Sequence, residues 1–447
     1  EVRIFDENIS ATVADDLIVW KPHVAGFTCV TAALAPACRL AARLKESLKD
    51  ALVIVGGPHL SAVPVETIRD NPVIDFGFSG EAEKSLPVFL RGWFREGNRD
   101  ASFLSSVPGL VWRSGPKLTH NRAAAFLSDE ELDALPFPAW HLLPMERIFS
   151  KATHGLFSRG ERIMPVMTTR GCPNFCGFCC RVMGFQFRKT NLERVLLEIQ
   201  WLWHHWKVDE IYFEDDTFTQ DPERAHALLD AIIGLRLPIL VKFANGLRAD
   251  KVDRPLLEKM RRAGVYWIGF GIESGSPYTQ KLMHKNLDLD LAARNVALAK
   301  GMGFKVGSNC IIGYPGETRD SIRESVNYFL RLGLDSMAVV TCVPFPGTTA
   351  WQVCQQNGWL TERARHYENY WFEVFKVSPL IETPYLSAKD LSRAIFWTYV
   401  RFYFLNLRRT LLVASMLLRK WRGEWRHLAP ARWMRLLRNG SVARERG

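Results

Sequence analysis

Six strand-like segments alternate with helix-like segments between residues 165 and 343, and this alternation limits the fold of the 447-residue chain more than any other feature. The strand-like segments are apolar runs, as expected of parallel strands buried on both faces. They lie at residues 166–169, 210–214, 239–244, 265–272, 305–312 and 337–343. Six strand–helix units are two fewer than a closed eight-fold barrel contains, so the sequence predicts a partial (β/α)6 barrel.

Helix ends are also marked in this part of the chain. Thr190 and Glu193 have the spacing of a capping box, and Asp221 precedes a proline at the start of another helix. Gly264 and Gly301 follow helix-like segments and are predicted to end them.

A shorter alternation occupies residues 2–90, with strand-like runs at 2–5, 24–28, 52–55 and 74–78. It predicts an α/β fold with a doubly wound parallel sheet, and one strand–helix unit is expected to be missing before residue 1. In such sheets ligands bind beyond the carboxyl ends of the strands. The candidate residues at that edge are Thr28, Gly56, Gly57, His59, Gly80 and Glu81.

The chain is therefore predicted to have four parts. Residues 1–125 form the first domain, 126–160 a linker with little periodicity, 161–358 the barrel and 359–447 a helical C-terminal region.

Three cysteines, Cys172, Cys176 and Cys179, form a CxxxCxxC motif directly after the first barrel strand. Three thiolates on one loop can hold three irons of a [4Fe-4S] cluster and leave the fourth iron open, whereas electron-transfer clusters use four cysteines. Zinc sites usually add a second CxxC pair or histidines, and no second pair is present. A structural zinc or a closed cluster stays as an alternative. Cys180 is predicted to pack against its surroundings, with the alternative that it is itself a ligand.

The triplet, with Phe178 before its last cysteine, resembles that of the radical SAM enzymes. The segment GFGIES at 269–274 resembles their ribose-binding strand end, and IIGYPGET at 311–318 resembles their adenine-lining motif. The resemblance extends from Met164 to about Trp351. It implies that Cys172, Cys176 and Cys179 hold a [4Fe-4S] cluster and that the open iron binds S-adenosylmethionine (SAM).

The same resemblance implies that a set of residues around the cluster binds SAM, namely Phe178, Asp215, Asp216, Arg248, Glu273, Ser274, Gly313 and Pro315. The residues alone leave plainer alternatives. Asp215 and Asp216 could cap the following helix, and Glu273 could lie on the surface. Gly313 and Pro315 could merely form a turn, and Arg248 could be a solvated surface residue.

Gly56-Gly57-Pro58-His59, followed by Gly80-Glu81, resembles the cobalamin-binding domain that precedes the barrel in one branch of radical SAM proteins. Glycines let the backbone approach a bulky planar ligand. His23 matches only part of the cobalt-ligating DxHxxG motif and is predicted to be structural. His59 is predicted to contact the corrin edge or its loop, not the metal.

The chain has a formal net charge of +11, and residues 391–447 carry the whole excess, with thirteen basic and two acidic residues. The remainder is balanced, which argues against a nucleic-acid-binding core. Helices are predicted at 396–407 and 411–437. They are expected either to cover the barrel or to form a peripheral membrane contact, in a protein of the reducing cytoplasm.

Taken with the resemblance, these features predict an enzyme that uses a [4Fe-4S] cluster, SAM and cobalamin to methylate an unactivated carbon of a small-molecule or lipid-like substrate. A flavodoxin or ferredoxin is the expected electron donor, and no nucleic acid is an expected partner. The alternatives are an oxidative cyclase or rearrangement enzyme with the same cofactors, and a non-catalytic iron–sulfur or zinc module. The residues that contact the reacting substrate atoms are not identified by the sequence.

Overall fold

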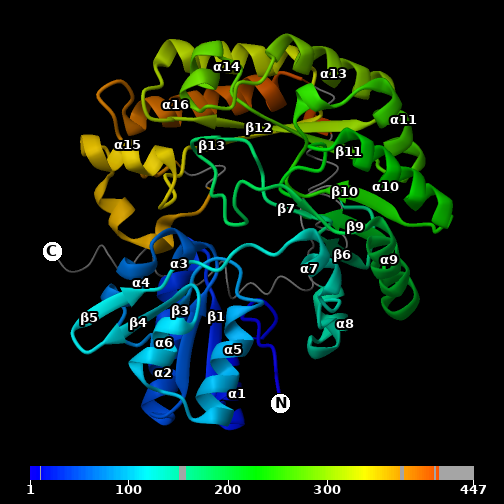
Figure 1. Ribbon diagram of the computed structural model, residues 1–447. Coiled ribbons are helices and arrows are strands. Elements are labelled where there is room, and N and C mark those ends of the chain that lie inside the picture. The colour runs from blue at the N-terminus through cyan, green and yellow to red at the C-terminus, as the bar shows by residue number, and fades with distance from the viewer. Residues whose placement is uncertain (11, 151–157, 373–376, 407–408, 412–447) are drawn as a thin grey trace.

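The computed structural model describes residues 1–10, 12–150, 158–372, 377–406 and 409–411. Figure 1 shows a first domain with its own sheet lying below a barrel, to which it is joined by the segment around α7 (Asp129–Ala134). None of the helices within the described residues combines the length and the apolarity that a bilayer crossing requires.

The first domain contains one five-stranded sheet. Its strands, in spatial order, are β1 (Val24–Thr28), β2 (Leu52–Gly56), β3 (Phe76–Phe78), β4 (Leu110–Ser114) and β5 (Lys117–His120). β1 to β3 are parallel, whereas β4 and β5 form an antiparallel hairpin. The parallel sheet predicted from residues 2–90 is confirmed in β1 to β3, and the hairpin extends it beyond that range. The strand expected at residues 2–5 is wrong, because that segment has no regular structure.

Helices cover both faces of this sheet, as predicted. Val53, Val55 and Val111 pack toward Leu34 and Leu60 on one face. On the other face Ile54, Phe76 and Trp112 pack toward the later helices. The helices are α1 (Val13–Trp20), α2 (Leu34–Ser47), α3 (Pro58–Ala62), α4 (Pro64–Asp70), α5 (Ser85–Arg91) and α6 (Ala101–Ser106).

The barrel has six parallel strands in chain order, which confirms the predicted partial barrel. Bridges from Val241 to Val265 and from Leu247 to Phe270 connect its two three-stranded halves. The strands are β6 (Ile163–Val166), β9 (Glu210–Phe213), β10 (Leu240–Phe243), β11 (Trp267–Glu273), β12 (Lys305–Ile312) and β13 (Ser336–Thr341).

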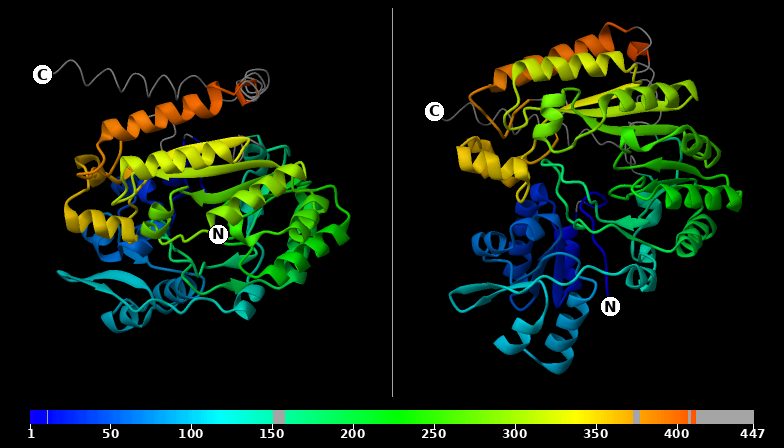
Figure 2. Two further views of the ribbon diagram at one scale, coloured as in Figure 1. Left: turned by 90° about the horizontal axis from the view of Figure 1, so that it is seen from above. Right: turned by 45° about the horizontal axis from the view of Figure 1, so that its top comes forward.

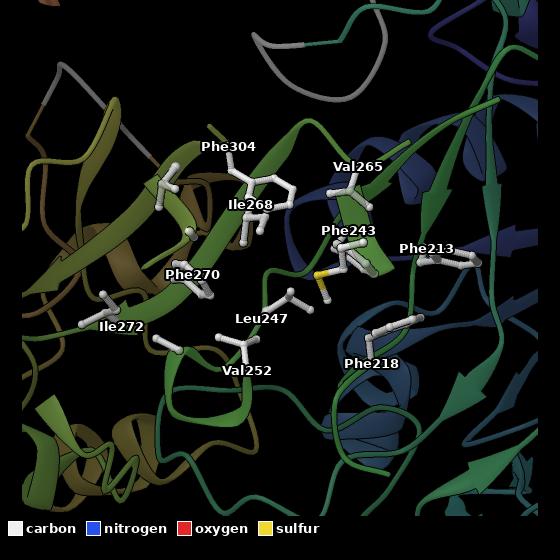
Figure 3. Packing of buried hydrophobic residues seen from close by; sticks show 14 of the residues in the cluster. Phe213, Phe218, Phe243, Leu247, Val252, Val265, Ile268, Phe270, Ile272 and Phe304 are labelled. Atoms are coloured by element: carbon white, nitrogen blue, oxygen red, sulfur yellow. The ribbon is translucent and has the colours of Figure 1, made fainter. Parts of the chain in front are cut away.

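The helices between these strands pack on a continuous apolar core. Phe213, Phe218 and Phe243 form one part of it, with ring centroids 4.6–5.9 Å apart (Figure 3). The helices that contribute to this core are α9 (Leu192–Trp206), α10 (Pro222–Leu235), α11 (Arg254–Arg262), α13 (Leu289–Gly301) and α14 (Arg319–Arg331). Two further helices, α12 (Pro277–Leu282) and α15 (Thr349–Asn357), contribute to a separate apolar cluster.

Two of the predicted helix ends are wrong. Asn191, not Thr190, caps α9, because its side chain accepts a hydrogen bond from the Glu193 amide. Gly301 lies within α13, and Gly303 takes the left-handed conformation beyond it. Asp221 caps α10 and Gly264 follows α11 at a φ of +92°, both as predicted.

The linker contains α7 and α8 (Met145–Phe149), and the described part of the C-terminal region contains short helices joined by irregular segments. Its elements are η5 (Glu362–Arg365), η6 (Tyr367–Asn369), α16 (Ala388–Tyr399) and η7 (Val400–Phe404). Both views of Figure 2 show α16 lying alongside α14 on the outside of the barrel. Most of the helix expected at 411–437 lies outside the described residues.

Candidate functional site

The three cysteines lie on one loop between two short strands, β7 (Thr169–Arg170) and β8 (Arg188–Lys189), which pair in antiparallel register. Gly171 starts the loop at a φ of +84°, and a β-carbon there would lie 2.1 Å from the Gln186 carbonyl oxygen. Only glycine fits this position without moving the backbone. The Cys172 amide then donates to the Gly184 carbonyl (3.1 Å), so the loop is closed on itself.

The chemistry of this loop fits an iron–sulfur cluster. All nine cysteines are free thiols, and Cys176 is buried. Burial raises the pKa of the Cys176 thiol, and Lys285 and Arg248 oppose that rise. These two cations favour thiolates, which are the form that binds iron. In the described part of the chain, however, no three Cys, His, Asp or Glu side chains are arranged around a common metal position.

Two adjacent carboxylates hold the start of the cluster loop. Asp215 is buried and accepts hydrogen bonds from the Thr168 amide (2.5 Å), the Thr168 hydroxyl (2.7 Å) and the Thr169 amide (2.9 Å). Asp216 accepts from the Gly171 amide (2.9 Å). The alternative that this pair caps the next helix is wrong, because Asp221 does so.

Glu273 ends β11 at a φ of +67°, a strained conformation for a residue that is not glycine. It is 9% exposed and lies 3.5 Å from the Lys285 ammonium, so the surface alternative is wrong. Burial raises the pKa of its carboxyl, and Lys285 opposes the rise. The Lys285 ammonium also lies 5.8 Å from the centroid of the Phe178 ring, which brings Glu273 beside the cluster loop.

Ser274 is fully buried, and its hydroxyl is hydrogen-bonded to the Ser325 hydroxyl on α14 (2.8 Å). It also accepts a hydrogen bond from the Ser276 amide (3.2 Å). The side chain therefore fixes the end of β11 to a neighbouring helix.

The turn after β12 contacts the cluster loop directly. Gly313 has a φ of +78°, and its amide donates to the Glu317 carboxylate (2.6 Å). Pro315 is buried in the same turn. A β-carbon on Gly177 would lie 2.3 Å from the Tyr314 hydroxyl oxygen, so this turn packs against the cysteine motif.

Arg248 is not a solvated surface residue, since its side chain is 15% exposed. It forms two hydrogen bonds to Asp250 (3.0 and 2.8 Å) and one to the Lys285 carbonyl (3.2 Å). It also reaches the Asn174 side-chain oxygen (3.5 Å), and the Asn174 amide group lies 3.3 Å from the Cys172 sulfur.

The first domain presents its own glycine-rich edge. Gly57 has a φ of +95°, and a β-carbon there would lie 3.0 Å from the Cys29 nitrogen. Gly80 has a φ of +77° with open space where its β-carbon would be, and its amide donates to the Ser61 hydroxyl (2.9 Å). Thr28 is exposed at the end of β1, and Gly56 accepts from the Cys29 amide (2.9 Å).

His59 is only 1% exposed at this edge. Its ring packs on Tyr367 with centroids 4.6 Å apart, and its Nδ1 lies 3.3 Å from the Thr31 hydroxyl. The Nε2 atom is buried without a hydrogen-bond partner, and burial lowers the pKa of the imidazole to about 4. Contact between His59 and a corrin stays a prediction.

Glu81 has protein partners for both of its oxygens. It accepts from the Leu127 amide, Arg170 and Arg188, and its side chain is 5% exposed. The sequence did not identify Arg188, Lys285 and Tyr367. Each of them contacts a residue more than a hundred positions away along the chain, so no local spacing marks it. Tyr314 and Glu317 lie within the motif at 311–318 but were not singled out.

Comparison with known proteins agrees with this arrangement. The sequence model of the Radical SAM superfamily matches residues 166–329, and that of the B12 binding domain matches residues 1–90. The predicted domain limits at 125, 160 and 358 stay predictions.

Similar proteins include methyltransferases. An uncharacterized methyltransferase of Pyrococcus horikoshii is 26% identical over 90% of this chain and 84% of its own length. The cytidylyl-2-hydroxyethylphosphonate methyltransferase of Streptomyces wedmorensis is 28% identical over 70% of this chain and 62% of its own. This chain therefore spans less than two thirds of that second relative.

A solved structure shares the fold. The radical S-adenosylmethionine methyltransferase TsrM of Kitasatospora setae, with cobalamin and a [4Fe-4S] cluster bound, aligns with a TM-score of 0.62 at 17% identity. The alignment covers 77% of this chain and 66% of TsrM. With a B12-binding domain followed by a six-stranded barrel that carries the cysteine triplet, this chain belongs to the cobalamin-binding branch of the radical SAM enzymes.

Proposed function

We propose that this protein is a cobalamin-dependent radical SAM methyltransferase that acts on an unactivated carbon. The observation that carries the proposal is that the cluster loop faces the glycine-rich edge of the first domain. Arg170 and Arg188, at the two ends of the cluster loop, contact Glu81, which directly follows Gly80. On the other side, a β-carbon on Gly347, after β13, would lie 3.3 Å from Ala62 of α3.

The residues divide between the two cofactor sites. Cys172, Cys176 and Cys179 would hold the cluster, and Lys285 and Arg248 would stabilise their thiolates. Glu273, Gly313 and Pro315 would line the SAM site beside Phe178. Asp215 and Asp216 would position the cluster loop by accepting hydrogen bonds from its first amides. The backbone at Thr28, Gly56, Gly57 and Gly80 would approach the corrin.

When bound, the cluster supplies the electron that cleaves SAM, and cobalamin carries the methyl group. The overall reaction converts R–H to R–CH3 and consumes two molecules of SAM and two electrons. It releases S-adenosylhomocysteine, methionine and 5′-deoxyadenosine. A one-electron protein reductant of the flavodoxin or ferredoxin class would supply the electrons, and a small molecule or a lipid would be the substrate.

The first prediction concerns the cysteines. After anaerobic purification with iron, sulfide and cobalamin, the wild type should form both S-adenosylhomocysteine and 5′-deoxyadenosine. Cys176→Ala should lose the cluster absorbance and should form at least about a hundredfold less 5′-deoxyadenosine than the wild type. Cys180→Ala removes the neighbouring exposed thiol and is the matched control, which should keep both.

The same assay separates the rival functions. Label from the SAM methyl group in a product supports methyl transfer. 5′-Deoxyadenosine without S-adenosylhomocysteine or labelled product would favour the cyclase or rearrangement enzyme. A wild type that takes up no cluster, or a Cys176→Ala variant with an unchanged spectrum, would favour the non-catalytic module.

We further propose that the protein contacts a membrane surface peripherally through α16 and η7. Four apolar side chains on α16, on η7 and directly after η7 are 59–75% exposed, namely Phe396, Trp397, Phe404 and Leu405. Arg393 and Arg401 flank them on the same elements and are also exposed. Exposed aromatic side chains beside arginines are typical of helices that bind anionic bilayer surfaces.

The second prediction tests this contact by co-sedimentation with vesicles that contain phosphatidylglycerol. The double variant Phe396→Ser/Trp397→Ser should bind at least about tenfold more weakly. The control Val19→Ser/Phe94→Ser removes exposed apolar side chains from the first domain and should bind like the wild type. Equal binding by all three proteins would reject the membrane contact.

A further inference from the structure

One arginine lies fully buried between the two domains. Arg188 is 1% exposed, and its guanidinium donates to both Glu81 oxygens (2.9 and 2.8 Å). It also donates to the Leu127 carbonyl (3.1 Å) and the Met183 carbonyl (2.7 Å). The guanidinium therefore joins the first domain, the linker and the cluster loop at one point.

The carboxylate on the other side of this contact is equally occupied. Glu81 accepts a further hydrogen bond from the Leu127 amide (2.9 Å) and one from Arg170 (3.1 Å). Arg170 also pairs with Glu83 (2.7 Å). Because Arg170 and Arg188 are directly paired across β7 and β8, a single carboxylate holds both ends of the cluster loop.

The linker lies directly against the same loop. The Phe126 ring lies 4.7 Å from the Arg188 guanidinium. A β-carbon on Gly184 would lie 2.4 Å from that ring. Burying a charge is costly unless all its hydrogen bonds are made, so such a pair persists only in one arrangement. Glu81 follows Gly80, whose open left-handed turn belongs to the proposed cobalamin edge.

We propose that Glu81, Arg188 and Arg170 are positioning residues that fix the cluster loop relative to the cobalamin-binding edge. This inference rests on the proposed function and reassigns Glu81 from ligand contact to interdomain contact. Methyl donation requires SAM at the barrel mouth to face the first domain, whereas radical formation requires only the cluster. A displacement of about 1 Å can cost a hundredfold in rate, so loosening this contact slows methyl donation first.

The third prediction is therefore that weakening this contact lowers S-adenosylhomocysteine formation more than it lowers 5′-deoxyadenosine formation. Glu81→Gln keeps the shape of the side chain and leaves Arg188 buried without a counter-charge. It should lower S-adenosylhomocysteine formation at least tenfold and change 5′-deoxyadenosine less than threefold, with unchanged iron and cobalamin per chain. Arg188→Lys keeps the positive charge but loses the several hydrogen-bond donors of the guanidinium. It should also lower S-adenosylhomocysteine more than 5′-deoxyadenosine, but by a smaller factor.

Lys84→Ala is the matched control. It breaks an exposed ion pair between the first domain and the linker, Lys84 to Glu131, whose side chains are both 43% exposed. Both products should stay within twofold of the wild type. Unchanged products in Glu81→Gln would overturn the proposal. An equal fall of both products with loss of iron would also overturn it, because Glu81 would then merely support the cluster loop.

Hydrogen exchange tests the contact without any catalysis. In Glu81→Gln the amides of residues 80–83 and 171–187 should both exchange at least fivefold faster, and in Lys84→Ala neither segment should change. Faster exchange in only one segment would reject the coupling. If the wild type forms no S-adenosylhomocysteine, the proposed function fails, and this comparison still decides whether the contact joins the two loops.

Discussion

At the scale of single residues, buried carboxyls do most of the positioning around the candidate site. Glu317 is fully buried and holds the turn after β12 by accepting from the Gly313 and Tyr314 amides and the Thr279 hydroxyl. Burial raises the pKa of its carboxyl to about 7, although these hydrogen bonds lower it. A carboxyl that binds its proton more tightly when folded stabilises the fold at low pH.

The fourth prediction follows from the direction of this shift. The stabilisation is complete below about pH 4.5 and is lost as pH rises through about 7. Glu317→Gln is neutral at every pH, so its free energy of unfolding relative to the wild type should rise between pH 5 and pH 8 by on the order of 2 kcal/mol. Thermal unfolding at both pH values measures this.

Asp320→Asn is the control for Glu317→Gln, because that carboxylate lies exposed at the start of α14. Its difference from the wild type should be the same at both pH values. A pH-independent difference for Glu317→Gln as well would show that the carboxyl titrates in its ordinary range.

At the scale of secondary structure elements, η6 joins the C-terminal region to the first domain. It contacts η1 (Thr31–Ala33) and α2, and Tyr367 packs against the apolar core of that domain as well as against His59. The Tyr370 hydroxyl donates to the Ala364 carbonyl (3.0 Å), which keeps the turn compact. The segment therefore connects the C-terminal region to the first domain through residues other than Arg188 and Glu81.

The fifth prediction removes this connection. Tyr367→Ala should destabilise the protein by about 1–3 kcal/mol and make the segment 359–386 more sensitive to limited proteolysis, because the aromatic burial is lost. Tyr385→Ala truncates a ring that is 55% exposed and is the control. Identical cleavage of the two variants would mean that Tyr367 does not anchor the segment.

The elements that the sequence predicted well are those whose pattern is local. The barrel strands are uninterrupted apolar runs, and β12 has the predicted limits. The β4–β5 hairpin was missed because exposed Lys117 and His120 give its second strand no apolar face. Short antiparallel strands at a sheet edge depend on their neighbour for stability, so residue pattern alone identifies them poorly.

The same contrast holds for the candidate site. Cys172, Cys176 and Cys179 lie within eight residues, so their spacing alone identified the motif in the sequence. The partner of Glu81 is Arg188, more than a hundred residues away, so only the folded chain brings the pair together. Side chains that bind a cofactor are marked by motifs, whereas those that hold two domains together are marked by contacts.

At the scale of the whole molecule, the first domain meets the rest of the chain at contacts that include Glu81 with Arg188, Ala62 with Gly347, and His59 with Tyr367. The first two join it to loops of the barrel, and the last joins it to the C-terminal region. The net charge of +11 plays no part in this arrangement, because residues 1–390 are balanced. The excess belongs to residues 391–447, mostly outside the described part of the chain.

The contact between His59 and Tyr367 has a consequence for synthesis on the ribosome. About 300 residues separate the two side chains. At roughly 5–20 residues per second, Tyr367 is synthesised some 15–60 s after His59. During that interval the surface around His59 is still uncovered in the nascent protein. The first domain is therefore complete on the ribosome well before its His59 ring is covered by the C-terminal segment.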